Sequence, residues 1–222
     1  MNANGGMVRR YFRLGLATGL IVLATGCTGI NPFDKPAPDL YVLTPKSSFS
    51  SDLPNVNWQL TVELPLADAG INTSRIAARK SSVSIDYFQG ANWIDTAPRM
   101  VQTLLVESFE NSNQIIGVGR QSAVLRSDYT LLLDLREFQA EYMGGVATPS
   151  AHVRLNAKLV RLPQRVIVAT KNADYSTRSK SGGLEDVVRA FDESLGKVLK
   201  DIVEWALAAV PPKLENPLRR RR

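Results

Sequence analysis

Cys27, which is the single cysteine of the chain, limits what the rest of it can fold into more than any other residue does. Three arginines within residues 9–13 precede twelve uncharged, largely apolar residues, 14–25. A run of this length is shorter than the roughly 20 residues that cross a bilayer, but it is typical of the apolar part of a signal peptide. We therefore expect residues 1–26 to be a removed signal peptide that contributes nothing to the fold.

The residues before Cys27 predict a lipid anchor. Residues 23–27 (LATGC) resemble a bacterial lipobox, whose cysteine becomes the first residue of the mature chain and is acylated; Ala24 stands where leucine is usual. The alternative is an ordinary secretory signal with an unrelated thiol nearby, but a lone cysteine in an exported protein has no partner. Because an intrachain disulfide is excluded, packing must stabilise the domain.

The distribution of charge argues against nucleic acid as a partner. The formal net charge is +6, but three of the positive charges lie in residues 9–13 and four in Arg219–Arg222, so residues 27–218 carry about −1. A nearly neutral body lacks the basic surface that binds a phosphate backbone. We expect residues 211–222 to be a disordered basic tail, which is either solvated or in contact with anionic lipid headgroups.

Composition and hydrophobic alternation divide the mature chain into a tether and one domain. Residues 27–39 contain three prolines and predict a flexible, lipidated tether, whereas residues 40–210 predict a single domain. Alternating apolar residues predict strands; they lie at 39–44, 58–64, 82–88, 115–119, 129–138, 153–159 and 166–175. In the third of these, Val83, Ile85 and Tyr87 form the buried face and Gly90 marks the end. Residues 66–80 show no clean period.

Two helices and a bulged hairpin complete the expected fold. The first helix begins after Thr96 as N-cap, with Pro98 in its first turn, and ends at 111–113. The second spans Leu184–Ala209, and its broad apolar stripe suits packing on a sheet. A change in the parity of the apolar residues predicts a β-bulge near residues 136–137. The sequence predicts an α+β fold: a single layered domain, with a mixed or antiparallel sheet and two helices packed on one face.

The sequence offers no recognisable catalytic constellation. His152 is the one histidine, and its strand places it on a polar face; with an acylated cysteine it leaves too few ligands for a typical zinc site. Gly117 and Gly119 precede no helix that would bind phosphate. Glu137 and Glu141 are interpreted as solvated carboxylates. We expect no enzymatic activity, no metal and no cofactor, and we interpret the chain as a binding or scaffolding component.

Several segments resemble the ABC-type transport auxiliary lipoprotein family. The stretch 85–98 (IDYFQGANWIDTAP) is the most specific part of this resemblance. The others are 41–43 (YVL), 74–79 (SRIAAR), 128–131 (DYTL), 135–142 (LREFQAEY), 187–191 (VVRAF) and 199–205 (LKDIVEW). These segments are distributed from residue 41 to residue 205, so the resemblance extends over most of the mature chain.

The resemblance implies a periplasmic lipoprotein that acts beside an ABC ATPase, a permease and a mammalian-cell-entry (MCE) protein. Such systems move phospholipids or other lipids between two membranes, and the lipoprotein would serve the outer-membrane end of the route. Thr28, where aspartate retains some lipoproteins in the inner membrane, favours outer-membrane anchoring. A homo-oligomer is left open. A different interpretation is a structural or assembly lipoprotein for an outer-membrane protein or a glycolipid machine.

The residues of the most specific stretch have two interpretations. In one, they stabilise the fold: Trp93 closes the core, Pro98 starts the helix and Tyr87 fills the sheet. In the other, residues 75–79 and 90–95 form a surface that docks the MCE protein or a sister subunit, because arginines offer bidentate donors to phosphate or carboxylate. The candidate partner- or lipid-binding residues are Arg75, Arg79, Tyr87, Trp93 and Asp95.

Overall fold

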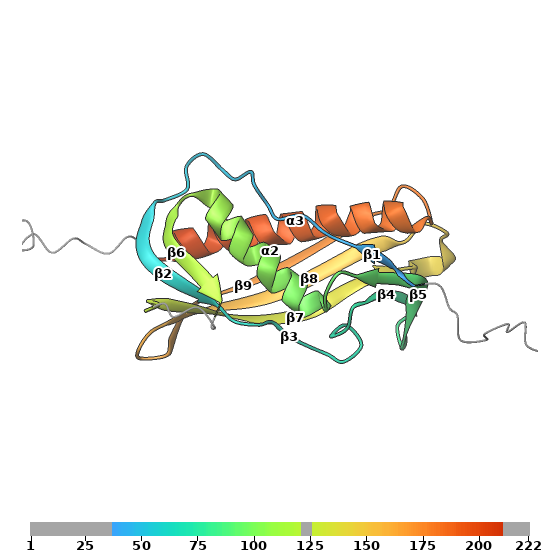
Figure 1. Cartoon of the computed structure of the whole chain (residues 1–222), viewed down its shortest axis with the longest axis horizontal. Helices are drawn as coiled ribbons and strands as arrows, with labels where there is room; N and C mark the ends of the chain where they lie inside the picture. Colours follow the sequence, from blue (N-terminus) through green and yellow to red (C-terminus); the bar gives the residue numbers. More distant parts are fainter. Residues whose placement is uncertain (1–36, 121–125, 211–222) are drawn as a thin grey trace, which may run out of the picture. The chain divides into compact units, whose positions relative to one another are not determined.

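The computed structural model describes residues 37–120 and 126–210 (Figure 1). The predicted signal peptide, Cys27, most of the tether and the basic tail lie outside these residues. The described residues from Pro38 onward belong to one compact unit. Within the described ranges, neither helix combines the length and the apolar character that crossing a bilayer requires.

This part of the chain forms a nine-stranded sheet and two α-helices. In chain order the elements are β1 (Asp39–Tyr41), β2 (Val56–Val62), β3 (Leu66–Ala67), β4 (Arg75–Ser81), β5 (Ser84–Trp93), α2 (Ala97–Ser112), β6 (Ile115–Arg120), β7 (Tyr129–Glu141), the 3-10 turn η1 (Met143–Gly145), β8 (Ser150–Arg161), β9 (Val166–Arg178) and α3 (Leu184–Ala209).

Strand β7 organises the sheet because both of its edges are paired. One edge pairs antiparallel with β8 from Tyr129 to Glu141, and β8 pairs antiparallel with β9. The other edge pairs in parallel with three strands in succession: β2 first, then β3, then β4. Strand β6 extends the sheet from β2, while β5 and β1 extend it from β4. The sheet is therefore mixed and divides at β7.

Both helices cover the same face of this sheet (Figure 1). Helix α3 packs along β8 and β9, helix α2 packs along β2 and β6, and the two helices contact each other. This arrangement confirms the α+β prediction of one layered domain with two helices on one face of a mixed sheet.

The helix ends follow from local chemistry that the sequence displays. Thr96 is the N-cap of α2 and Pro98 follows within the first turn, where its missing N–H leaves no hydrogen bond unmade. Asn113 closes the helix in the left-handed region, with φ of 53°, and its N–H donates to the Glu110 carbonyl. Glu185 and Asp186 place negative charge at the N-terminus of α3, where it interacts favourably with the positive end of the helix dipole.

Three aromatic side chains join the sheet to α3 at the centre of the core. The ring of Trp93 on β5 lies edge-on to Phe138 of β7 and to Phe191 of α3, at centroid distances of 5.7 and 5.2 Å. Phe138 and Phe191 are also 5.2 Å apart. All three are at most 1% exposed, so they bury much apolar area for their number.

The half of the sheet around β4 and β5 differs from the sequence prediction. Residues 66–80 show no clean period in the sequence, yet β4 begins within them, and its Ile76, Ala77 and Ala78 are all buried. Because successive side chains of a strand point to opposite faces, this consecutive burial means that both faces of β4 are covered, and the apolar residues of such a strand need not alternate.

Strand β5 was predicted at 82–88 but spans Ser84–Trp93. Between its pairings at Tyr87 and at Asn92, strand β5 contains more residues than the matching stretch of β4. Gly90 is one of these extra residues and has a φ of 67°, so it lies within the strand and does not end it. Such an irregularity needs a residue that tolerates the left-handed region. Val83 was expected on the buried face but is 92% exposed in the β4–β5 turn, and Ile85 is 38% exposed. Tyr87 is half-buried, as its pattern required.

Replacing Trp93 by alanine tests this core. We expect Trp93→Ala to reduce the free energy of unfolding by about 3–5 kcal/mol, because a large buried ring leaves a cavity. Ile94→Ala changes the neighbouring residue, which is 56% exposed, and should cost no more than about 0.5 kcal/mol. Urea unfolding of both variants measures the difference; equal stabilities would contradict the core position of Trp93.

Candidate functional site

A cluster of polar side chains occupies the face of the sheet that points away from the helices. The β-bulge between Leu135 and Glu137 places it there. Before the bulge, the odd-numbered residues of β7 face the core. After it, the even-numbered Phe138 and Ala140 face the core, so the side chains of residues 137, 139 and 141 point to the opposite face. The pairing with β8 then sets 154 opposite 137 and 152 opposite 139. We call this cluster the polar network; it comprises Arg79, Glu137, Gln139, Glu141, His152, Arg154 and Asp174.

Glu137 lies at the centre of the polar network. One carboxylate oxygen accepts a hydrogen bond from Arg79 Nη2 at 2.9 Å and another from Gln139 Nε2 at 2.6 Å. The second oxygen accepts from Arg154 Nη2 at 2.7 Å. The side chain of Glu137 is only 12% exposed. The prediction of a solvated carboxylate is therefore wrong, since two guanidinium groups balance its charge.

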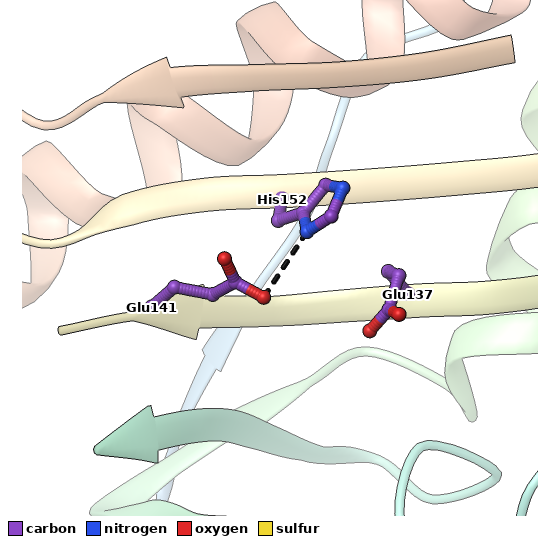
Figure 2. A group of neighbouring side chains, drawn as sticks. All are labelled: Glu137, Glu141 and His152. Atoms are coloured by element: carbon purple, nitrogen blue, oxygen red, sulfur yellow. Dashed lines mark hydrogen bonds and ion pairs between the residues drawn. The ribbon is translucent and has the colours of Figure 1, made fainter. Parts of the chain in front are cut away.

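Glu141 extends the network to the next strands. Its Oε1 accepts from Arg79 Nη1 at 3.2 Å and from Gln139 Nε2 at 2.9 Å, and it lies 3.1 Å from Nδ1 of His152. Figure 2 shows this imidazole beside the Glu141 carboxylate, with Glu137 farther along the same strand. Glu141, too, is largely withdrawn from solvent, because its side chain is 14% exposed. Gln139 thus bridges the two glutamates, and Arg79 joins β4 to both.

His152 lies between two carboxylates. Its Nε2 is 2.7 Å from Asp174 Oδ1, and its Nδ1 faces Glu141. Burial lowers the pKa of His152, but hydrogen bonds to Glu141 and Asp174 and their negative charges outweigh burial and raise that pKa above 6.5. For Glu141, burial raises the pKa, while hydrogen bonds from Gln139 and His152 and the charges of His152 and Arg79 bring it below 4.5 overall.

The network contains three groups at ligand spacing for a metal ion. One ligand atom from each of Glu137, Glu141 and His152 falls within 4.8 Å of the others. However, Arg79 and Arg154 already donate to these carboxylates, and a divalent cation bound there would contact two guanidinium groups. We interpret the cluster as an ion-pair network; the expected absence of a metal site stays a prediction.

An open cavity of about 510 Å³ adjoins the network. Its lining is Leu66, Ala67, Asp68, Arg79, Asp134, Leu135, Arg136, Glu137 and Arg154. Three arginines are matched by three carboxylates, and Arg136 pairs with Asp134 at 2.9 Å, so the charge does not favour an anion. The cavity is therefore a polar recess lined by three arginines, three carboxylates and three apolar residues.

The five candidate residues lie in different environments. Arg75 and Tyr87 are together, since the Arg75 guanidinium carbon is 3.5 Å from the Tyr87 ring centroid and the Tyr87 hydroxyl donates to the Gly70 carbonyl. Arg79 belongs to the polar network. Asp95 is exposed beside α2, and its carboxylate accepts from the Thr96 N–H at 2.6 Å.

Trp93, by contrast, is 1% exposed and packs into the core, so its indole does not reach a surface. The docking interpretation of the sequence remains open for Arg75, Tyr87 and Asp95, and the structure does not gather all five candidates into one surface.

Sequence reasoning missed the network itself. Gln139, Arg154 and Asp174 received no role, although polar residues at 137, 139 and 141 follow the predicted bulge in steps of two. If residues 129–141 are paired with residues 150–161 and the bulge is allowed for, Arg154 falls opposite Glu137 and His152 falls opposite Gln139. The pairing of β4 with β7, which brings in Arg79, leaves no comparable signal in the sequence.

These features define a class of protein: an α+β domain whose helices cover one sheet face and whose other face carries an internally neutralised polar network. The chain belongs to the family of ABC-type transport auxiliary lipoprotein components, whose model matches residues 41–203. The description of this family is that of a lipoprotein component auxiliary to ABC-type transport.

Solved structures agree with this assignment. The crystal structure of protein XCC0632 from Xanthomonas campestris, of the family DUF330, is 32% identical, with a TM-score of 0.73 over 77% of this chain and 95% of that one. The crystal structure of a second, uncharacterized protein shares the fold alone, at 15% identity and a TM-score of 0.59 over 75% of this chain and 97% of that one.

Protein bll6063 from Bradyrhizobium diazoefficiens is also similar. It is 30% identical over 118 residues, which are 53% of this chain. The match spans 31% of the length of that relative.

A comparison of two adjacent cations tests the polar network. Arg79→Ala removes a shared partner of Glu137 and Glu141, and we expect a loss of about 1–3 kcal/mol in the free energy of unfolding because largely buried carboxylates lose donors. Lys80→Ala removes an exposed pair with Asp86 and should cost less than about 0.5 kcal/mol. Chemical denaturation measures both; an Arg79→Ala variant as stable as the wild type would contradict a structural network.

The raised pKa of His152 predicts a pH dependence of stability. Because the folded-state pKa exceeds the unfolded one, the contribution is complete below the unfolded pKa and is lost as pH rises through the folded one. The wild type should therefore lose stability between about pH 5.5 and about pH 8.5 relative to His152→Gln, which cannot titrate. Urea unfolding at both pH values measures this; parallel behaviour of the two proteins would contradict the interpretation.

Proposed function

We propose that the chain is the membrane-anchored, periplasmic auxiliary lipoprotein of an MCE-type ABC lipid transporter. It docks the system at the outer membrane and aids the transfer of phospholipid or another lipid between membranes. The observation that carries this proposal is the family match across residues 41–203. The lipobox at Cys27 supports it independently, since an acylated cysteine holds a domain at a membrane.

The proposed role is non-enzymatic. The carboxylates of the polar network are held by Arg79 and Arg154, and His152 lies between two acids rather than beside a nucleophile. A general base must reach the proton that it removes, and a nucleophile must reach that base. The network instead ties β4, β7, β8 and β9 together on the face that lacks helices. Docking and anchoring are the tasks that such a domain suits.

Recovery of partners from cell envelopes tests this proposal. We expect the acylated full-length chain, extracted in mild detergent, to bring down an MCE protein with the permease and ATPase of its transporter, and mass spectrometry to find bound phospholipid or another lipid. Cys27→Ala is the matched control; it should be absent from the membrane fraction because it carries no acyl chain.

Two outcomes would contradict the proposal. Recovery of an outer-membrane protein or a glycolipid machine, with neither MCE protein nor lipid, would replace it by an assembly function. Membrane association of Cys27→Ala equal to that of the wild type would contradict the lipid anchor.

A further inference from the structure

We infer that the outer face of the β1 edge, formed by Leu40, Val42 and Ile94, lies against the lipid surface of the membrane that holds the acyl anchor. These three side chains are 59%, 62% and 56% exposed. The inference rests on the proposed lipid anchor at Cys27 and adds to it a second contact, made by the folded domain itself. We call the three residues the edge patch.

The backbone pairing makes the edge patch contiguous. Strand β1 is the last strand on its side of the sheet and pairs in parallel with β5, with Leu40 beside Asn92 and Tyr41 beside Trp93. The N–H of Ile94 donates to the Tyr41 carbonyl at 2.9 Å, so the register continues and Val42 lies beside Ile94. Tyr41 and Trp93 point to the core side, and alternation then turns the edge patch to the opposite face.

An exposed apolar edge of this kind requires a cover. Unpaired edge strands with apolar side chains invite association with whatever apolar surface is near, and soluble domains usually protect them with charge, proline or a bulge. Asp39 is the one charged residue of β1 and Pro38 directly precedes it, but the side chains of Leu40 and Val42 that follow are apolar and exposed.

The position of the edge patch along the chain favours lipid as its cover. Leu40 follows Cys27 by 13 residues, of which 27–36 lie outside the described residues. Whatever its conformation, a chain of 13 residues spans at most about 45 Å. Among the described elements, β1 is therefore the nearest along the chain to the predicted acyl anchor, and so short a connection gives its side chains a high effective concentration at the bilayer.

The neighbours of the edge patch have the chemistry of a membrane interface. Arg75 of β4 pairs with Asn92 of β5, and Asn92 pairs with Leu40 of β1. The cationic Arg75 therefore lies in the same cross-strand row as Leu40, two strands away. Its guanidinium stacks on Tyr87. Arginine and tyrosine place an apolar body against acyl chains and a polar end at the headgroups. Asp39 and Asp95 are also near, so net charge does not drive the contact and apolar burial does.

Fluorescence quenching by brominated lipid tests the edge patch. In the acylated full chain the thiol of Cys27 is blocked, so Ile94→Cys introduces a single free thiol for a bimane label. Ile116→Cys is the matched control, because Ile116 is 67% exposed on β6, at the opposite end of the sheet order. Each labelled protein is bound to phosphatidylcholine vesicles with and without brominated acyl chains, after its melting temperature has been compared with that of the wild type.

We expect brominated chains to quench the label at residue 94 and to leave the label at residue 116 unchanged. Equal quenching at both positions, or none at 94, would overturn the inference. The label at residue 94 could instead be shielded from solvent to the same degree with and without brominated lipid, and more strongly at higher protein concentration. That result would show a second copy of the protein at the edge patch and would also overturn the inference. If the vesicles float without the protein, the lipid anchor fails as well; if they float with it but show no quenching, only the edge patch fails.

Discussion

The pairing of strand β7 on both edges is the constraint on which the rest of the structure depends. Its antiparallel partner β8 supports the face on which α3 packs, while its other edge holds β2, β3 and β4 end to end. One bulge within β7 then sends Phe138 into the core and Glu137 to the opposite face. The aromatic cluster and the polar network therefore arise from the same irregularity, one on each side of the sheet.

The elements that the sequence predicted well are those with one covered and one open face. Strand β8 alternates buried and half-buried residues through most of its length, and α3 begins at Leu184 and ends at Ala209 as its apolar stripe indicated. Strand β4 was not predicted because Ile76, Ala77 and Ala78 are buried in succession, so both faces are covered and no alternation marks the strand. The polar network was not predicted for a related reason. Arg79 contacts Glu137 because β4 pairs in parallel with β7, and the periodicity of a single strand contains no information about such a pairing between distant segments.

The two faces of the sheet are consistent with the docking role that we propose. The helix face is a closed apolar core, and on the other face Arg79 and Arg154 pair with Glu137. Family membership connects this domain to ABC transport, and the lipid anchor that we predict at Cys27 would attach it to a membrane. On the proposed account, the chain contributes attachment and position to a transporter whose motor lies elsewhere, and the end of the domain nearest the tether rests on lipid.

Reconstituted lipid transfer tests the central claim most directly. Donor vesicles would hold the ABC transporter that the chain captures, and acceptor vesicles would hold either the acylated chain or an equal amount of Cys27→Ala protein in solution. The account predicts ATP-dependent movement of labelled phospholipid that is faster when the acylated chain is anchored in the acceptor membrane. Equal rates with the anchored and the unanchored protein would contradict it.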